Sequence, residues 1–430
     1  MTGALLIAGI TVIAFILSIL FLPQVCVKGR TVKIYPFIPL LGGILMLLGG
    51  GVTGRELAVA FTEDSSVNPI RILVLFISMT VFSLILEQTG FFEHISGIVL
   101  QKSGHSQYRI FLSLYAIISI LTVFTSNDIV ILTFTPFICH FCKSAKVDPV
   151  PYLIMEFVAA NTWSLFLLIG NPTNIYISGA FHIGFGEYLR VMALPTVAAG
   201  VTSLTVMMLI FRKKLRGEVQ TAHFVPPITD RPLMWVALVH LAGCVVLLAV
   251  SQTLNLEMWL ISCFMGISAL LSSVICLLIR RRDLRAVGNA IAKIPYEIIP
   301  FIVGMFVMVL ALESCGFTQG AARTLGSGEG IFSVGFLSFL SSNVLNNIPM
   351  SVLFSKILST GASSGQIYAT IIGSNIGAFI TPVGALAGIM WINLLKQNRV
   401  KLTTRRFVAM GCTIGIPSMA ASLAVLWLFV

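Results

Sequence analysis

Residues 159–174 read AANTWSLFLLIGNPTN, and residues 373–388 read GSNIGAFITPVGALAG. Both stretches leave an apolar run and then break at glycine and proline, with amide or hydroxyl side chains beside the break. Proline removes a helical hydrogen bond and glycine permits tight backbone geometry, so each stretch is predicted to be an interrupted helix. Asn375 follows Asn161 by 214 residues. The second stretch therefore repeats the first.

Two further matches lie on the amino-terminal side of these stretches. TSNDIVILTFTP begins at Thr125 and SSNVLNNIPMSV at Ser341, while LEQTGFF begins at Leu86 and LESCGFT at Leu312. The matches occur in the same order, and the interval between copies stays between 214 and 226 residues. A duplicated apolar half with polar breaks at matching places is the pattern of a secondary transporter.

The composition places the chain in a membrane. Hydrophobic residues make up 57% and charged residues 10% of the sequence, against about 25% charged residues in an ordinary soluble domain. The mean hydropathy is +0.99, and apolar runs of membrane-spanning length recur throughout. Runs of this length exceed barrel strands, so the protein is predicted to be helical. The first run, 4–22, lacks the features of a signal peptide and is expected to be a retained span.

One run in each half is predicted to be a re-entrant hairpin. Run 108–142 is too long for one crossing and carries the polar triplet SND, from Ser126, at its middle, so the triplet is expected at the hairpin tip. Run 331–358 repeats this feature, with Ser342-Asn343 as the expected tip.

A second run in each half is the interrupted helix. Run 150–182 is broken at 170–174, and run 366–395 is broken at 381–384. Irregular backbone is tolerated at membrane depth only where it faces protein or a water-filled cavity. Both breaks are therefore expected to face the interior of the protein.

The placement of basic residues indicates the topology. The net charge is +11, and 22 of the 27 Lys and Arg residues fall in six short stretches: 28–34, 101–109, 143–149, 212–232, 280–296 and 396–406. Cytoplasmic loops carry such an excess, so these stretches are assigned to the cytoplasm, and nucleic acid is excluded as a partner. With this assignment, both ends of the first hairpin lie on the cytoplasmic side of the membrane. The two halves have opposite orientations, with the N- and C-termini outside.

We therefore predict an all-α polytopic protein of the inner (plasma) membrane. It is an inverted-topology repeat of about 10 transmembrane helices plus two re-entrant hairpins and two interrupted helices. The first repeat is expected at 1–216, a cytoplasmic linker at 217–232 and the second, inverted repeat at 233–430. Such repeats place the substrate near the midplane, where hairpin tips and broken helices meet.

Amides and hydroxyls gather at the tips and breaks. The predicted substrate-binding residues are Ser126, Asn127, Asn161, Thr162, Asn171, Thr173, Asn174, Asn343, Asn346, Asn347, Asn375, Thr381 and Gly384. Helix N-termini that point into a cavity favour anions, whereas unwound carbonyls and helix C-termini suit cations. The alternative is that these amides cap helix ends and bridge helices.

Asp128 and Glu156 are the predicted ion-coupling residues. Asp128 places a carboxylate at the first tip, where the second half has Val344. A charge in the bilayer interior costs about 2.5–3.5 kcal/mol or more, so it is normally functional or paired. We favour a proton or sodium relay for Asp128, with capping of the hairpin's own amides as the alternative. Glu156 is either a second titrating site or an acid near the cytoplasmic interface.

The eight cysteines form no disulfide framework. Cys139 and Cys142 form a C-x-x-C pair that suits soft metalloid centres, although apolar neighbours and the lack of further ligands favour ordinary packing. No HExxH motif and no zinc-ligand spacing occur. We therefore predict no catalytic residue, no metal site and no cofactor, and expect that the protein is not an enzyme.

Several stretches together resemble the arsenite efflux permeases of the ArsB/NhaD group. They include LEQTGFFEHISGIVLQKSG from Leu86, TSNDIVILTFTPFI from Thr125, SNVLNNIPMSVL from Ser342 and GSNIGAFITPVGALAGIMW from Gly373. This group belongs to the ion transporter superfamily, which also holds sodium/proton antiporters and dicarboxylate, citrate and sulfate carriers. The resemblance implies transport driven by a proton or sodium gradient, through an elevator movement against a scaffold. One stretch departs from it, because GNPTN at 170–174 is closer to the Gly-x-Pro-x-Asn loop of the anion carriers.

The expected function is export of arsenite or antimonite, coupled to a proton gradient by alternating access. The GNPTN loop keeps open a sodium- or proton-coupled anion or carboxylate transporter (citrate- or sulfate-like), or a sodium/proton antiporter. A channel and an intramembrane enzyme are the alternatives from other classes. The expected partners are a small ion or metalloid substrate, H⁺ or Na⁺, and the lipid bilayer. The resemblance also allows a homodimer and a separate cytoplasmic ATPase subunit.

Overall fold

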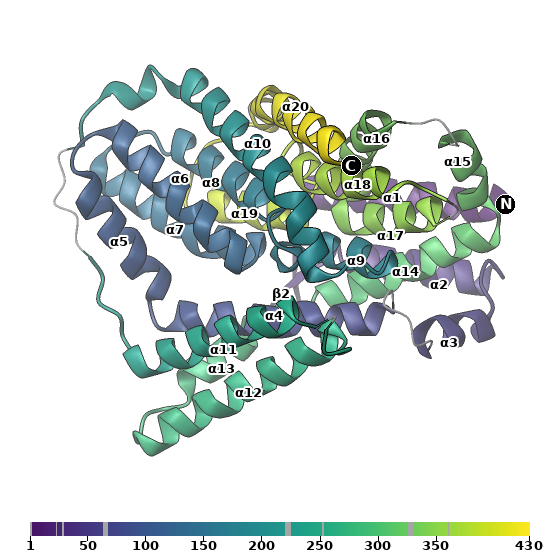
Figure 1. Cartoon of the computed structure of the whole chain (residues 1–430), viewed down its shortest axis with the longest axis horizontal. Helices are drawn as coiled ribbons and strands as arrows, with labels where there is room; N and C mark the ends of the chain where they lie inside the picture. The colour runs from purple at the N-terminus through teal and green to yellow at the C-terminus, as the bar shows by residue number, and fades with distance from the viewer. Residues whose placement is uncertain are drawn as a thin grey trace.

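The computed structural model shows an almost entirely helical protein (Figure 1). It describes residues 2–22, 24–27, 30–62, 68–219, 225–251, 253–325, 330–359 and 361–430. Within these ranges the chain forms twenty α-helices, two short 3₁₀ turns and one antiparallel pair of strands. The strands are β1 (Gln24–Val27) and β2 (Arg30–Lys33), with Val25 opposite Val32.

The helices fall into two series of ten. The first series is α1 (Thr2–Phe21), α2 (Phe37–Leu48), α3 (Gly54–Thr62), α4 (Pro69–Gln88), α5 (Phe91–Ser103), α6 (Gln107–Phe124), α7 (Asn127–Ala145), α8 (Val150–Trp163), α9 (Pro172–Ala180) and α10 (Phe185–Phe211). The second series is α11 (Arg231–Ala249), α12 (Met258–Ile279), α13 (Arg285–Ala292), α14 (Ile298–Ser314), α15 (Phe317–Leu325), α16 (Ile331–Leu345), α17 (Asn347–Leu358), α18 (Ser364–Gly377), α19 (Leu386–Gln397) and α20 (Thr404–Phe429). The 3₁₀ turns are η1 (Leu168–Gly170) and η2 (Lys214–Arg216).

Helices of the same rank in the two series share local features. α4 and α14 are each followed by a glycine in the left-handed region, Gly90 at φ 73° and Gly316 at φ 79°. A residue with a side chain is strained there, so glycine allows each helix to turn at once into the short helix that follows. α10 and α20 are the longest helices, with 27 and 26 residues, and each contains a proline, Pro195 and Pro417. The duplication predicted from sequence is therefore present in the helix order.

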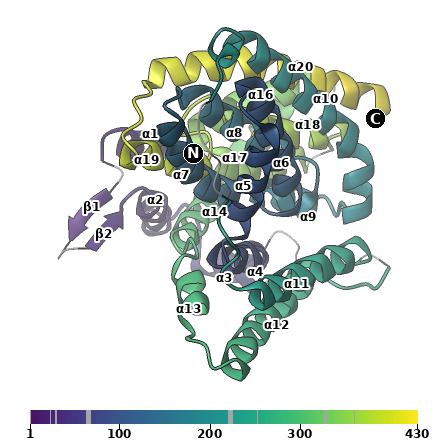
Figure 2. The same ribbon diagram turned by 90° about the vertical axis from the view of Figure 1, so that its left-hand side faces the viewer.

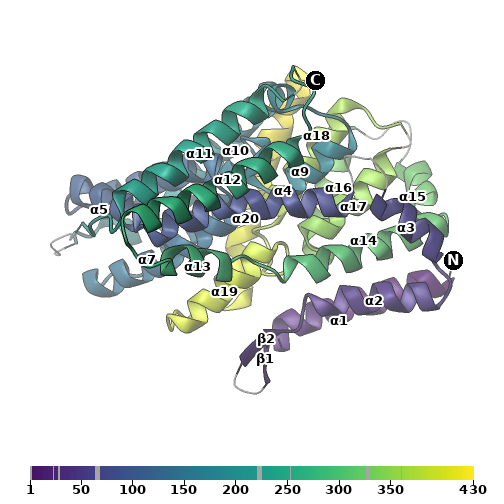
Figure 3. The same cartoon turned by 90° about the horizontal axis from the view of Figure 1, so that it is seen from below.

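The helices pack into two groups. The hairpins, the interrupted helices and the long helices α10 and α20 form one bundle, the core bundle (α6–α10 and α16–α20). A second group forms a scaffold (α1, α2, α4 and α11–α14), in which α14 lies along α2 and α12 along α4. Figure 2 shows α11, α12 and α13 set apart from the core bundle, and Figure 3 shows α1 and α2 below α14.

Close packing inside the scaffold depends on Gly304. A Cβ atom at this position of α14 would lie 2.2 Å from the backbone nitrogen of Leu40 in α2. Only glycine lets the two helix backbones approach so closely, as small residues do between membrane helices.

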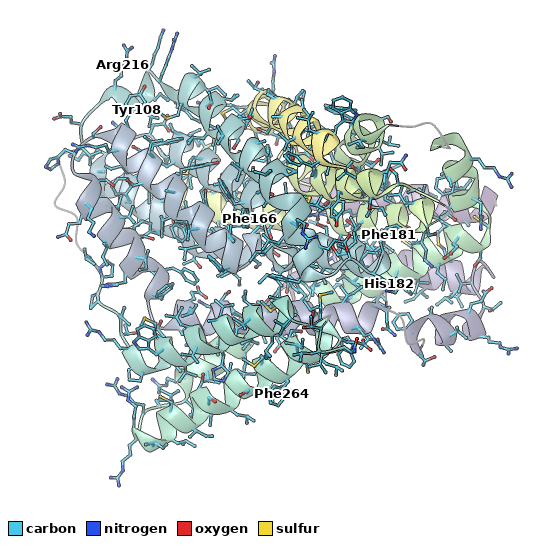
Figure 4. The ribbon with its side chains drawn as sticks, in the orientation of Figure 1. Tyr108, Phe166, Phe181, His182, Arg216 and Phe264 are labelled. Carbon is cyan, nitrogen blue, oxygen red and sulfur yellow. The ribbon has the colours of Figure 1, made fainter. Side chains whose placement is uncertain are left out.

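Large apolar side chains point outward from the bundle, as a lipid-facing surface requires. Phe264 on α12 is 71% exposed and projects away from the other helices (Figure 4). Among the described residues, seven helices are long and apolar enough to cross a membrane, or eight if the α14–α15 pair, bent by 70°, counts as one span. Four shorter apolar helices accompany them, including α16 and α17 of the second hairpin.

The first predicted hairpin tip is correct and the second is displaced. α6 ends at Phe124 and α7 starts at Asn127, so the chain turns at Thr125 and Ser126. In the second copy, Ser342 and Asn343 still belong to the last turn of α16, and the break falls at Asn346, with φ 75°. With ψ 151°, Asn346 lies outside the αL region, in a backbone conformation that costs a residue other than glycine about 1–3 kcal/mol and that the surrounding contacts must hold.

Candidate functional site

The two interrupted helices meet at Asn375 near the end of α18. Its amide nitrogen donates to Asn174 Oδ1 at 2.7 Å, and its carbonyl oxygen accepts from Asn171 Nδ2 at 2.8 Å and from Ser164 Oγ at 3.0 Å. The hydroxyl of Ser374 donates to Thr173 Oγ1 at 3.1 Å. All of these side chains are buried. This network joins the break of the first repeat to the second repeat.

The break of the first repeat requires Gly170. A Cβ atom there would lie 2.3 Å from the backbone oxygen of Ser164, so no other residue fits. The chain then turns so that Asn171 caps α9, with its Oδ1 accepting from the backbone nitrogen of Thr173 at 3.1 Å. The GNPTN loop thus ends one helix and starts the next within a buried stretch.

Asn161, the counterpart of Asn375, has a different set of partners. Its Oδ1 accepts from Asn127 Nδ2 at 3.1 Å, and its Nδ2 donates to the backbone oxygen of Phe157 at 2.8 Å. The positions that correspond to Asn171, Thr173 and Asn174 are Ala385, Ala387 and Gly388. Because these residues offer no side-chain amide or hydroxyl, the inter-repeat network is not reproduced. Asn161 instead faces the tip of the first hairpin.

The second hairpin is bound to the second break. Asn343 Oδ1 accepts from the backbone nitrogen of Thr381 at 2.9 Å, and Asn346 Nδ2 donates to the backbone oxygen of Val383 at 2.8 Å. The backbone nitrogen of Asn347 donates to the backbone oxygen of Gly384 at 2.9 Å. Each hairpin tip therefore contacts the interrupted helix of its own repeat.

Among the nine buried side-chain oxygens of the described residues that have no hydrogen-bond partner, four lie at the hairpin tips and near the helix breaks. These atoms are Ser126 Oγ, Thr162 Oγ1, Asn347 Oδ1 and Thr381 Oγ1. Leaving a buried polar atom unpaired costs about 1–3 kcal/mol. Four such atoms on the four predicted site elements mark where a bound solute could supply hydrogen bonds.

Asp128 lies in the first turn of α7 and is 9% exposed. Its backbone nitrogen donates to Asn127 Oδ1 at 3.0 Å, and Ser126, at the N-cap position of α7, makes no side-chain capping bond. Among the described residues, the Asp128 carboxylate accepts no hydrogen bond. The amino-terminal end of a helix favours a negative charge.

Glu156 is enclosed by three helices. Its side chain is fully buried, and its carboxylate accepts from Thr135 Oγ1 at 2.7 Å and from Trp391 Nε1 at 3.3 Å. It therefore links α8 to α7 of the first hairpin and to α19 of the second repeat. Thr135 and Trp391 were not predicted as site residues, since they lie far from Glu156 in the sequence.

Cys139 and Cys142 are 7% and 1% exposed within α7. No group of three or more His, Cys, Asp or Glu residues in the described part of the chain is placed to hold a metal ion. Both thiols belong to the buried apolar cluster of the core bundle.

The family model for citrate transporters (CitMHS) matches residues 12–369. The arsenical pump membrane protein of Escherichia coli K12 is 25% identical over 404 residues, covering 90% of this chain and 91% of that protein. The protein of the same name from Yersinia enterocolitica is 25% identical over 373 residues, covering 82% of this chain and 84% of that protein.

The fold is similar to that of two solved transporters. The Alcanivorax borkumensis YdaH transporter superposes with a TM-score of 0.57 at 14% identity, covering 99% of this chain and 98% of that one. The efflux pump MtrF of Neisseria gonorrhoeae superposes with a TM-score of 0.55 at 14% identity. This match covers 100% of this chain and 94% of that one. At this identity the likeness concerns the fold alone. The family match covers most of the sequence, and the chain belongs to the citrate transporter (CitMHS) family of the ion transporter superfamily.

Proposed function

We propose that the protein exports arsenite or antimonite from the cytoplasm, driven by inward movement of protons through alternating access. The observation that carries the proposal is the set of four unpartnered oxygens, Ser126 Oγ, Thr162 Oγ1, Asn347 Oδ1 and Thr381 Oγ1, on the two tips and the two interrupted helices. Trivalent arsenic and antimony hydroxides are neutral and carry hydroxyl groups that both donate and accept hydrogen bonds. Hydroxyl and amide oxygens suit such a solute.

The names of the relatives support this substrate. Two of them are arsenical pump membrane proteins that align over most of their length. Under this proposal Asp128 binds the coupling proton and Glu156 transmits its charge state to α19. The core bundle would move against the scaffold and carry the site across an inner membrane, with both termini outside. A homodimer and a cytoplasmic ATPase subunit remain expectations from the resemblance.

The test is export from cells that lack their own arsenite exporter. Cells expressing the protein should grow at arsenite concentrations that stop the empty-vector strain, and their arsenic content, measured by mass spectrometry, should be lower. The Asn127→Ala variant, matched for membrane expression, should accumulate arsenic as the empty-vector strain does. Equal arsenic content in the wild-type and empty-vector strains would contradict the substrate.

A citrate-like anion is the second candidate, favoured by the family model and by two capped helix starts. Asn171 caps α9, and Asn346 Oδ1 accepts from the backbone nitrogen of Ile348 at the start of α17, at 3.4 Å. Helix N-termini attract anions. Uptake of citrate, sulfate and arsenite into proteoliposomes under imposed proton or sodium gradients separates the two candidates.

The role of Asp128 has its own test. Asp128→Asn should abolish the pH dependence of transport while the protein still binds substrate. An unchanged pH profile in this variant would remove Asp128 from the coupling step and leave the substrate proposal standing.

A further inference from the structure

An ion pair joins the end of α14 to the end of α17. Lys356 Nζ lies 2.9 Å from Glu313 Oε2 and donates a hydrogen bond to Glu313 Oε1 at 3.3 Å. Glu313 belongs to α14 of the scaffold, whereas Lys356 belongs to α17, the second arm of the second hairpin in the core bundle. The two helices pack against each other. This ion pair therefore connects the two groups of helices.

The other ion pairs between described residues stay on one side of the boundary between core bundle and scaffold. Five lie in the scaffold or in segments next to its helices: Lys33 with Glu297, Arg71 with Glu257, Arg280 with Asp230, Arg285 with Asp283, and Lys293 with Glu87. A sixth, Lys214 with Asp148, joins two segments next to core-bundle helices. Within the described part of the chain, only the pair of Lys356 and Glu313 crosses the boundary.

The first repeat provides a matched ion pair that does not cross the boundary. Glu87 precedes Glu313 by 226 residues and lies at the end of α4, as Glu313 lies at the end of α14. Its partner is Lys293, which follows α13, with Nζ 2.9 Å from Glu87 Oε1. Both α4 and α13 belong to the scaffold and pack together. Equivalent acids thus form equally short ion pairs, one within the scaffold and one between the two groups.

Helix α17 connects this ion pair to the candidate site. The helix begins at Asn347, whose Oδ1 is one of the unpartnered oxygens and whose backbone nitrogen donates to the backbone oxygen of Gly384 at 2.9 Å. Lys356 lies about 14 Å further along the helix, at a rise of about 1.5 Å per residue. The ion pair therefore ties the helix that carries Asn347 to the scaffold.

The exposure of the pair suits a contact that opens and closes. The side chain of Lys356 is 29% exposed and that of Glu313 is 33% exposed. Water and salt screen such a pair, so its net contribution to stability is small. Because the stretch 280–296 is assigned to the cytoplasm, α14 is expected to end at the outer side of the membrane. The pair is then expected to meet the outer solution.

We propose that the ion pair of Lys356 and Glu313 is a latch that holds the core bundle against the scaffold in this conformation, and that transport requires the latch to open. The inference rests on the proposed movement of the core bundle against the scaffold. The closed latch fixes α17, and with it Asn347, relative to α14. When the latch opens, the second hairpin moves with the core bundle and Lys356 separates from Glu313. The pair of Glu87 and Lys293 lies within the scaffold and stays closed.

The first experiment fixes the latch covalently. Glu313→Cys/Lys356→Cys is made with the partly exposed Cys315 replaced by alanine, and a short bismaleimide then joins the two new cysteines. Peptide mass mapping quantifies the link, and maleimide also blocks thiols that would otherwise bind arsenite. Arsenite transport in proteoliposomes should fall in proportion to the linked fraction and continue after a monofunctional maleimide. The linked control, Glu87→Cys/Lys293→Cys, should transport as its monofunctionally labelled form does.

The second experiment changes the charges and needs no substrate. Amide hydrogen exchange of the protein in lipid nanodiscs, followed by mass spectrometry, reports how often the ends of α14 and α17 open. Glu313→Lys should speed this exchange about two- to fivefold, the range expected for a partly exposed ion pair. Glu313→Lys/Lys356→Glu restores the pair with reversed polarity and should return the exchange toward the wild-type rate. Glu87→Lys should leave the ends of α14 and α17 unchanged.

Unimpaired transport by the linked Glu313→Cys/Lys356→Cys protein would overturn the latch, since the two positions would then stay together through the cycle. Equal inhibition by the link in Glu87→Cys/Lys293→Cys would overturn it as well. If the cysteine variants do not fold, hydrogen exchange decides, and a reversed pair that exchanges as fast as Glu313→Lys contradicts the latch. Failure of the proposed function looks different. Wild-type protein would then move no arsenite, while exchange would still respond to Glu313→Lys and to the reversed pair.

Discussion

The amide nitrogen of Asn375 lies 2.7 Å from Asn174 Oδ1, and this hydrogen bond ties the interrupted helices of the two repeats together. Asn161 holds the corresponding position in the first repeat but bonds to the hairpin residue Asn127 instead. One asparagine of the pair is therefore saturated by protein groups, and the other lies beside the unpartnered oxygen of Thr162. Asn375 therefore joins the two interrupted helices, whereas Asn161 joins the first hairpin to the interrupted helix of its own repeat.

This difference predicts contrasting effects for Asn375→Ala and Asn161→Ala. Asn375→Ala leaves Asn171 Nδ2 and Asn174 Oδ1 without their partner, at about 1–3 kcal/mol for each unpaired group. Its thermal unfolding midpoint in detergent should fall clearly. Asn161→Ala should unfold close to the wild-type temperature yet lose most transport. Equal destabilisation of both variants would show that the two positions are equivalent.

Glu156 is predicted to act through its charge rather than its shape. Glu156→Gln keeps an acceptor for Trp391 Nε1 and a donor for the hydroxyl of Thr135, so the fold should be retained. Transport should lose its response to the proton gradient. Trp391→Phe should instead keep that response with a moderately lower unfolding midpoint. Proton-driven uptake into vesicles measures the first effect, and a wild-type response in Glu156→Gln would contradict it.

Gly304→Ala is predicted to separate α2 from α14. The new Cβ atom would clash with the backbone of Leu40. Backbone atoms, unlike a side chain, cannot avoid the clash by a change of rotamer. Such overpacking typically costs about 1–3 kcal/mol and more when backbone must shift. The control is Gly288→Ala, in helix α13, where no atom lies within 4 Å of the new Cβ. Unfolding midpoints of the two variants should differ, with only Gly304→Ala below the wild type.

Asp148, in the loop between α7 and α8, gives a prediction about pH. Burial alone would raise its pKa, but hydrogen bonds from Lys214 and the Val150 amide, with the charge of Arg406, hold the pKa below its usual value. The folded pKa is lower than the unfolded one, so the stabilisation is present above the unfolded pKa and is lost as the pH falls through the folded value.

Because both partners are 40% exposed, the pair contributes less than about 1 kcal/mol. Asp148→Asn should lower the unfolding midpoint slightly at neutral pH. As the pH is lowered, the midpoint of this variant should fall less steeply than that of the wild type. Asp283→Asn, which alters a more exposed ion pair, is the control. If Asp148→Asn lowered the unfolding midpoint more at low pH than at neutral pH, relative to the wild type, the prediction would be contradicted.

The sequence by itself determined the membrane class, the duplication and the approximate places of the polar breaks. These properties depend on local chemistry: long apolar runs need lipid, and proline and glycine interrupt helices wherever they occur. The first hairpin tip and both interrupted helices could therefore be predicted from residue type alone.

The tertiary structure decided which polar groups are satisfied and which are left for a ligand. Sequence treated Asn161 and Asn375 as equivalent, yet their partners come from segments far apart in the chain. It placed the second tip at Ser342-Asn343, whereas packing against Val383 and Gly384 fixes the break at Asn346. Hydrogen bonding and charge interactions act through space, so only the fold reveals which of many similar residues meet.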